Sequence, residues 1–268
     1  IEEVGYFGPQ LIQNGDFSQE GSELITNGDF ATDSGWSKGT GWSISGGSAS
    51  RTAQSGSTAC DQSISLNANK TYKIVYDLTV DAGSFNVRFS GTTNVNGETR
   101  TTSGTYTDYL KAATGNNTFR LVGADSAFTG SIDNVSVKEV GQNWTLGTGW
   151  SIGDGKAIQD GTGNNSSIEQ TSVFVVGKKY KINIEVLTLT QGQLEIYAGY
   201  PNTNIKTINS VGSYTFYIEG EGNGRFYAKP VNSFIGSVTN ISVKEIIGDK
   251  PRIDYSDSST EPSLLLEP

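Results

Sequence analysis

The 268 residues include 19 Lys and Arg against 28 Asp and Glu, a net charge of −9, and 34% are hydrophobic. An acidic chain repels the phosphate backbone, so we expect no nucleic-acid partner. No apolar run approaches the roughly 18 residues that cross a bilayer, so we also expect no membrane insertion. At roughly 150 residues per domain, the length predicts about two domains.

Histidine is absent, which excludes Ser-His-Asp and Cys-His catalysis and every metal site that needs histidine. The single cysteine, Cys60, can form no internal disulfide, and we expect it to be a small core residue. The carboxylates fall mostly in turns or at outward strand positions, where they are expected to be solvated. We therefore predict no catalytic residues and no enzymatic activity.

Residues 1–23 form an N-terminal segment. Its Glu3-Val4-Gly5 matches Glu139-Val140-Gly141, so we interpret the segment as the end of a missing upstream repeat. It also contains the sequence LIQNGDF at 11–17, which matches LITNGDF at 24–30. The match indicates that one opening strand has been duplicated.

Residues 24–140 and 141–247 are two copies of one domain. The sequence GTGWSI at 39–44 recurs at 147–152, and the same offset of 108 relates Trp36 to Trp144. Near the end, FTGSIDNVSVKE at 128–139 matches FIGSVTNISVKE at an offset of 106. After the second copy the composition changes, and residues 248–268 are interpreted as a linker or docking tail.

Apolar residues alternate with polar ones in each copy, as at Tyr72, Ile74, Tyr76, Leu78 and Val80. This period of two is typical of strands with one buried face, and no stretch shows a sustained helical period. Together with turn signals such as Asn-Gly, it predicts an all-β fold of two tandem jelly-roll β-sandwich domains with minimal helix. An immunoglobulin-like sandwich is the competing topology, although neither copy has the Cys-Trp-Cys spacing.

Several motifs resemble a known family. They are LITNGDF at 24–30, the Gly-Trp pairs at 35–36 and 41–42, Lys-Thr-Tyr at 70–72 and GSIDNVSV at 130–137. They resemble the carbohydrate-binding-module jelly rolls appended to xylanases and related glycosidases. The tandem copies, the linker VKEVG and the segments PRIDYS (251–256) and SLLLEP (263–268) are similar to virion surface proteins of tailed bacteriophages.

The resemblance implies a non-enzymatic protein of the virion surface: a tail fibre, a spike or a head (capsid) decoration. Its partners would be other virion proteins and host cell-surface glycans, and by analogy with fibres it would form a homo-oligomer, a trimer. Two alternatives stay open: a carbohydrate-binding-module pair of a secreted polysaccharide-degrading enzyme, and a spacer or capsid cement without a ligand.

The resemblance also implies a structural calcium ion in the first copy, held by Asp29 of the opening motif and Asp133 of the closing motif; no other cofactor is required. The alternative is that Asp29 caps a turn and Asp133 is a solvated strand residue. The second copy has Gly141-Gln142-Asn143-Trp144 in place of Asn-Gly-Asp-Phe, so we do not expect calcium there.

Modules of this family bind sugars with aromatic rings and polar side chains on an exposed sheet face. The corresponding outward positions are Asn86 and Arg88 in the first copy, and Glu195 and Tyr197 in the second, with Tyr200 in the next loop. Only the two tyrosines are suited to stacking on a sugar ring. The four tryptophans recur at equivalent positions, which indicates that they pack in the core.

Overall fold

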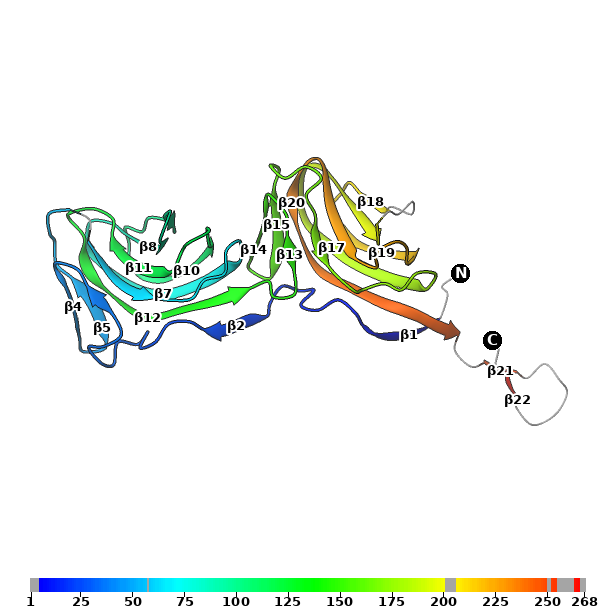
Figure 1. Cartoon of the computed structure of the whole chain (residues 1–268), viewed down its shortest axis with the longest axis horizontal. Helices are drawn as coiled ribbons and strands as arrows, with labels where there is room; N and C mark the ends of the chain where they lie inside the picture. Colours follow the sequence, from blue (N-terminus) through cyan, green and yellow to red (C-terminus); the bar gives the residue numbers. More distant parts are fainter. Residues whose placement is uncertain (1–4, 57, 201–205, 250–251, 255–262, 266–268) are drawn as a thin grey trace. The chain divides into compact units, whose positions relative to one another are not determined.

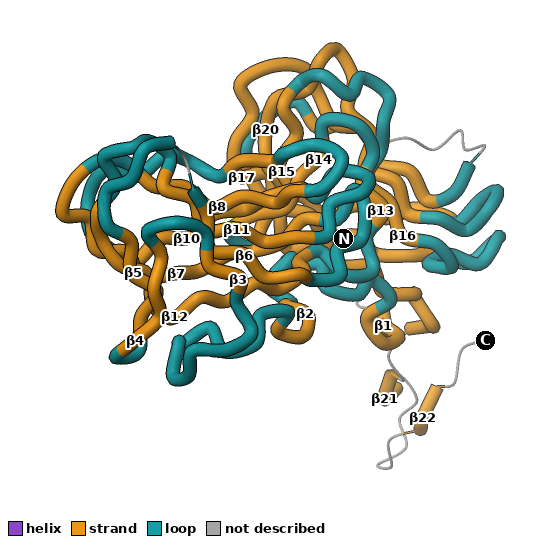
Figure 2. The backbone as a smooth tube through the Cα atoms, turned by 60° about the vertical axis from the view of Figure 1, so that its left-hand side comes forward, coloured by secondary structure: helices purple, strands orange, loops and turns teal. Residues whose placement is uncertain are grey.

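The computed structural model describes residues 5–56, 58–200, 206–249, 252–254 and 263–265. These residues form strands and loops and contain no helix (Figure 2), which confirms the predicted all-β fold. No membrane-spanning helix is therefore found in the described part of the chain. The chain divides into two compact units, and Figure 1 shows the strands of each.

The first-repeat unit consists of Phe17–Gln142 and Ser151–Gly155. Its strands form two antiparallel sheets, one in the order β10-β7-β12-β5-β4 with β2 beside β12, the other in the order β3-β6-β11-β8-β9. The strand bounds are β2 (Glu20–Glu23), β3 (Ser37–Lys38), β4 (Trp42–Ser45), β5 (Ser48–Arg51), β6 (Ala59–Ser63), β7 (Thr71–Ala82), β8 (Phe85–Ser90), β9 (Val95–Asn96), β10 (Gly104–Lys111), β11 (Thr118–Gly123) and β12 (Thr129–Val140).

The core of this unit lies between its two sheets, as in a β-sandwich. The inward side chains of β7 pack on those of β8: the ring of Tyr72 lies 5.6 Å from that of Phe89, and the ring of Tyr76 lies 5.6 Å from that of Phe85. Cys60 is fully buried in the same core, as predicted. The alternation seen in the sequence therefore gives the inward face of each sheet.

The second-repeat unit consists of Ile1–Asp16, Asn143–Trp150 and Lys156–Pro268. Its sheet has the order β13-β16-β20-β15-β14, with β1 beside β20, and with β18, β19 and β20 paired to β17. The strand bounds are β1 (Gly5–Gln10), β13 (Thr145–Leu146), β14 (Trp150–Gly153), β15 (Lys156–Asp160), β16 (Ile168–Gln170), β17 (Lys179–Ala198), β18 (Lys206–Ile208), β19 (Gly212–Glu219), β20 (Phe226–Asp249), β21 (Arg252–Asp254) and β22 (Ser263–Leu265).

Two long strands distinguish the second repeat from the first. β17 corresponds to β7 and β8 joined, and β20 corresponds to β11 and β12 joined. Gly83, with φ +75°, separates β7 from β8, whereas the equivalent Gly192, with φ +70°, lies inside β17 beside irregular pairing with β20. A glycine with positive φ therefore occupies this position in both repeats, at a gap between two strands in the first and within one strand in the second.

The opening segment at 11–17 packs against the second repeat. Leu11 N donates to Val243 O (2.9 Å), and Ile241 N donates to Gly15 O (2.9 Å). The indole of Trp144 donates to Asn14 O (2.8 Å). Before this segment, β1 pairs with β20 (Figure 1). This segment thus supplies the Asn-Gly-Asp that the second copy lacks after residue 140.

The segment at 24–30 makes the same contacts in the first repeat. Leu24 N donates to Val137 O (3.0 Å), Val135 N donates to Gly28 O (2.8 Å), and the indole of Trp36 donates to Asn27 O (3.0 Å). In chain order, the opening segment of the second-repeat unit therefore comes first, the first-repeat unit follows, and the rest of the second-repeat unit comes last.

This arrangement differs from the boundaries expected from the sequence. Residues 5–16, interpreted above as part of a separate N-terminal segment, belong to the compact second-repeat unit. The sequence EVG at 3–5, on which that interpretation rested, lies mostly outside the described residues. In the tail expected at 248–268, β21 pairs with β22, while residues 250–251, 255–262 and 266–268 lie outside the described part.

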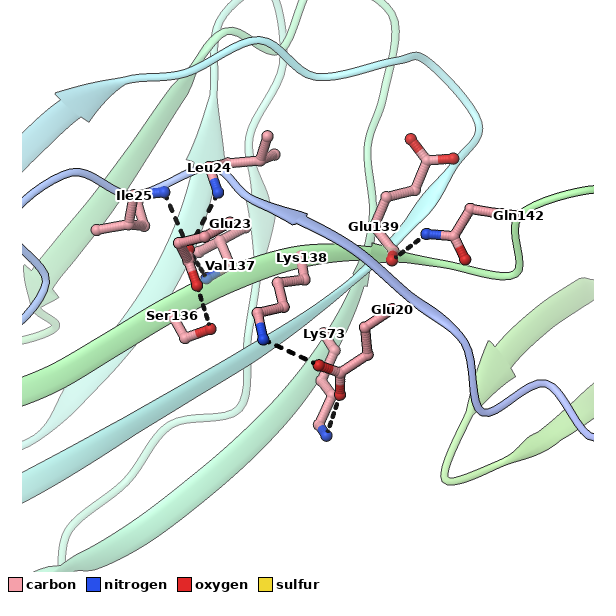
Figure 3. A network of polar contacts seen from close by, with 10 residues as sticks. All are labelled: Glu20, Glu23, Leu24, Ile25, Lys73, Ser136, Val137, Lys138, Glu139 and Gln142. Carbon is pink, nitrogen blue, oxygen red and sulfur yellow. Dashed lines mark hydrogen bonds and ion pairs between the residues drawn. The ribbon is translucent and has the colours of Figure 1, made fainter. Parts of the chain in front are cut away.

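Glu23 fixes the start of the first-repeat opening segment (Figure 3). Its carboxylate accepts hydrogen bonds from Leu24 N (3.1 Å), Ile25 N (3.0 Å), Val137 N (2.8 Å) and the hydroxyl of Ser136 (2.6 Å). The carboxylate thus ties the end of β2 to β12.

Candidate functional site

The outer face of β16, β20 and β17 carries a group of tyrosines in the second repeat. Leu194, Ile196 and Ala198 are buried, so alternation directs Glu195 and Tyr197 outward. Antiparallel pairing places Tyr197 opposite Tyr227 of β20, and Glu195 opposite Lys229. These positions border a hollow of about 360 Å³, which is lined by Asn165, Ser167, Tyr197, Tyr200, Tyr227 and Lys229.

The rings of this hollow differ in exposure. Tyr197 is only 7% exposed, whereas Tyr200 is 64% exposed and Tyr227 is half-buried. Tyr197 therefore forms a wall of the hollow, and the accessible stacking surface belongs to Tyr200 and Tyr227.

Tyr197 is held by two charged neighbours. Its hydroxyl donates to Glu195 Oε2 (2.6 Å), and Lys229 Nζ donates to Tyr197 Oη (3.1 Å) and lies 5.3 Å from the ring centroid. Burial and the Glu195 hydrogen bond raise the pKa of Tyr197. Burial alone would lower the pKa of Lys229, but Tyr197 and Glu195 outweigh it and raise that pKa. The wall thus keeps a neutral phenol and a charged ammonium.

Asn223 positions the two accessible tyrosines. Its Oδ1 accepts a hydrogen bond from Tyr200 N (3.1 Å), its Nδ2 donates to Tyr227 Oη (2.8 Å), and its backbone N donates to Tyr200 O (3.1 Å). The turn before Tyr200 needs Gly199, which has φ +108° and where a Cβ would lie 1.7 Å from Glu221 O. Asn223 thereby holds the side chain of Tyr227 and the backbone of Tyr200.

The equivalent face of the first repeat is charged. Arg120 of β11 lies opposite Arg88 of β8 on one side and Asp61 of β6 on the other. The guanidinium of Arg120 binds both carboxylate oxygens of Asp61, at 2.9 and 2.8 Å, and Arg88 Nε donates to Asn96 Oδ1 (2.5 Å). Arg88, Arg120 and Asp61 border a second hollow of about 390 Å³.

The structure distributes the five predicted sugar-binding residues between these two faces. Tyr197, Tyr200 and Glu195 come together in the second repeat, whereas Arg88 and Asn86 lie on the equivalent face of the first. Tyr197 and Asn86 are each only 7% exposed, which restricts their direct access to a ligand. No aromatic side chain lines the described hollow of the first repeat.

Sequence reasoning missed Tyr227, Lys229 and Asn223. The first two follow the same alternation, because Phe226 and Ala228 are buried. Their place opposite β17 required the pairing of β20 with β17, which a single sequence does not give. The predicted core position of the tryptophans is confirmed, since Trp36, Trp42, Trp144 and Trp150 are all at most 8% exposed.

The two aspartates expected to hold calcium make local hydrogen bonds. Asp29 Oδ1 accepts Ala31 N (3.3 Å), as in a capped turn, and Asp133 Oδ1 accepts Asn134 N (2.6 Å). Among the described residues, no group of three or more Asp, Glu, Cys or His side chains could hold a metal ion. Because calcium takes six to eight oxygen ligands, these two side chains alone do not supply a site, and we derive no role for the ion.

Comparison with known proteins gives no assignment. No protein-family model matches the chain, and no curated protein matches it.

Proposed function

We propose that the chain is a non-enzymatic, glycan-binding protein of a phage virion surface, a fibre or decoration, whose repeats are jelly-roll modules. Glycan binding is supported by the hollow of the second repeat that Tyr197, Tyr200 and Tyr227 line, here called the tyrosine hollow. Its exposed Tyr200 and half-buried Tyr227 offer apolar ring faces to the C–H groups of a sugar. Asn165, Ser167 and Lys229 provide hydrogen-bonding groups for hydroxyls around the same hollow.

The virion location is supported by the resemblance of the linker and tail motifs to phage surface proteins. On a particle, many copies would act together, so that a weak contact with host-surface glycans becomes effective attachment through avidity. Other virion proteins and further copies of this chain, as a trimer, are the partners proposed. A structural calcium in the first repeat stays a prediction.

Glycan titration tests the binding function. The full chain is screened on neutral oligosaccharides, and a binder is titrated by calorimetry against Tyr200→Ala and Tyr227→Ala. Loss of a stacking ring is expected to weaken binding about tenfold. Tyr217→Ala is the matched control, because Tyr217 is 45% exposed but lies on β19, away from the hollow. An equal loss in the control, or no binding by the unmodified protein, would exclude the proposed site.

The alternative, a module pair of a secreted polysaccharide-degrading enzyme, uses the same tyrosine hollow. Location separates the two hypotheses. Peptides of this chain found by mass spectrometry in purified virions, at many copies per particle, are the expected result. Peptides found only in culture supernatant and joined to a catalytic domain would favour the enzyme module.

A further inference from the structure

We infer that the outer face of the first repeat binds a carboxylate-bearing sugar, a uronic or sialic acid unit, through Arg88. This inference rests on the proposed function, because it assumes that both repeats use the same face for glycans. The two hollows lie over equivalent strands and are similar in size, about 390 and 360 Å³. They differ in chemistry: where the second repeat places Tyr197 opposite Tyr227, the first places Arg88 opposite Arg120.

Arg88 is the cation whose charge is least compensated on this face. Arg120 binds Asp61 with two hydrogen bonds, and Lys38 is paired with Asp33. Among the described residues Arg88 forms no ion pair, and its side chain donates a hydrogen bond to the neutral amide of Asn96. Like charges directly opposite each other in an antiparallel pair are destabilising, so a bound anion between the two arginines would relieve that repulsion.

The surroundings of Arg88 also disfavour its positive charge. Burial, followed by repulsion from Arg120, lowers the pKa of Arg88, and the smaller attraction of Asp61 only partly opposes this shift. The chain as a whole carries a net charge of −9, yet three of its cations border this one hollow. A carboxylate is the partner that the planar guanidinium fork fits best, because two parallel hydrogen bonds can form.

Neighbouring polar groups also lack partners. Asn86 and Ser90 flank Arg88 on the same face of β8, and the Oδ1 of Asn86 and the Oγ of Ser90 are buried without a hydrogen bond in the described structure. A buried polar atom without a partner costs stability, so these two atoms leave the hydrogen bonding beside Arg88 incomplete, although neither residue lines the hollow itself. The hollow has no aromatic lining, which disfavours a neutral sugar held by stacking and favours one held by charge and hydrogen bonds.

The experiment compares carboxylated sugars with matched neutral ones. The full chain is titrated with a panel of oligogalacturonate, oligoguluronate and sialyllactose, and with the methyl ester of each. We expect at least one acid to bind, at least tenfold more tightly than its ester and more weakly as salt is raised. Tight binding of the esters, or binding of none of the acids, would overturn the inference.

Variants locate the binding and separate it from the tyrosine hollow. Arg88→Gln is expected to weaken acid binding at least tenfold, whereas Lys111→Gln, which removes a cation from β10 in the other sheet, leaves it unchanged. Equal losses would show a general charge effect and contradict the inference. Polyglutamate bound as tightly as the sugar acids would show recognition of carboxylates without sugar selectivity, which also contradicts it.

Tyr200→Ala distinguishes failure of this inference from failure of the proposed function. It should weaken neutral-sugar binding about tenfold and leave acid binding intact. Neutral-sugar binding without acid binding would overturn only the inference for the first repeat. Acid binding that depends on Arg88, with no neutral-sugar binding, would overturn the tyrosine hollow as a site and retain the first repeat as the one that binds glycans.

Discussion

The two repeats share their inward residues and differ on their outward face. In both, a buried tryptophan donates to the carbonyl of the asparagine in the opening motif, at 3.0 Å for Trp36 and 2.8 Å for Trp144. On the outer face, in contrast, the Arg88–Arg120 pair replaces the Tyr197–Tyr227 pair. Because inward side chains determine packing and outward ones do not, the fold was retained while the outer face could diverge in ligand chemistry.

A second difference lies at the edge of the core. In the first repeat Asp108 is 5% exposed and accepts hydrogen bonds from Tyr76 Oη and from Arg100 Nη2, both at 2.9 Å. Burial and the Asp108 charge raise the pKa of Tyr76. In the second repeat Ile184 and Phe216 take the places of Tyr76 and Asp108. The first repeat therefore has an ionic network at positions where the second repeat has two apolar residues, and the network can be perturbed without affecting the second repeat.

The largest expected effect comes from the glycines of the two opening segments. A Cβ on Gly15 would lie 1.9 Å from Ile241 O, and one on Gly28 would lie 2.0 Å from Val135 O. We expect Gly15→Ala to destabilise only the second-repeat unit and Gly28→Ala only the first, each by about 3 kcal/mol or more. Hydrogen exchange measured by mass spectrometry shows which unit loses protection. The control is Gly8→Ala, where the nearest atoms lie 3.7 Å away.

Cys60 provides an independent reporter for the first unit. Burial and the neighbouring Asp61 carboxylate raise the pKa of Cys60 to about 12, so at pH 8 the folded thiol stays protonated and unreactive. Alkylation with iodoacetamide should therefore accelerate in Gly28→Ala and stay slow in Gly15→Ala. Acceleration in Gly15→Ala instead would mean that residues 11–17 stabilise the first repeat, contrary to the observed packing.

The next effect concerns the ionic network of the first repeat. Asp108→Ala removes the buried partner of Arg100 and of Tyr76 Oη, while Arg100 keeps its ion pair with Glu98 (2.7 Å), and should lower the stability of this unit by roughly 2 kcal/mol. Chemical denaturation followed by Cys60 labelling measures the loss. The double change Tyr76→Ile with Asp108→Phe, which introduces the second-repeat residues, should recover part of it; no recovery would show that the two repeats pack differently here.

The sequence predicted most of the fold, because the fold depends on local patterns. Alternation at residues 72–80 gave the strand and its inward face, and the repeated Gly-Trp positions gave the buried tryptophans. It did not predict which repeat receives residues 11–17, because LIQNGDF and LITNGDF carry nearly the same local signal. Only long-range pairing, of Leu11 with Val243 and of Leu24 with Val137, distinguishes them.

The sequence predicted only the part of the candidate site that depends on local patterns. Tyr197 and Tyr200 follow from one strand and its loop, but Tyr227 joins them through pairing of β17 with β20. The alternating pattern also did not predict how exposed each side chain is. Tyr197 points outward, but its neighbours cover it.

A smaller effect is expected at Glu23. The amide of Gln10 takes the equivalent place in the second repeat, where its Oε1 accepts Val243 N (2.8 Å) and Leu11 N (3.2 Å). Glu23→Gln should therefore retain the backbone contacts and cost only about 1 kcal/mol, from the loss of charge-assisted hydrogen bonds. Thermal denaturation measures this, with Glu23→Ala expected to cost more. Equal losses would show that the hydrogen-bonding oxygen is not what matters at this position.

The smallest expected effect is a difference in acid sensitivity. Glu20 is paired with Lys73 (2.6 Å) and Lys138 (3.1 Å), and these hydrogen bonds lower the pKa of Glu20 (Figure 3). In the second repeat Phe7 replaces Glu20 and lies 5.1 Å from Lys181 Nζ, a contact that does not titrate in acid. A lowered pKa stabilises the folded state above the usual glutamate value, and that stabilisation is lost as the pH falls below it. The first unit should thus lose stability on acidification, and Glu20→Gln should reduce that loss by less than about 1 kcal/mol, because the pair is partly exposed. Unfolding of this unit at pH 7 and pH 3, compared between the unmodified protein and the variant, measures the contribution; an unchanged acid sensitivity would assign it to other carboxylates.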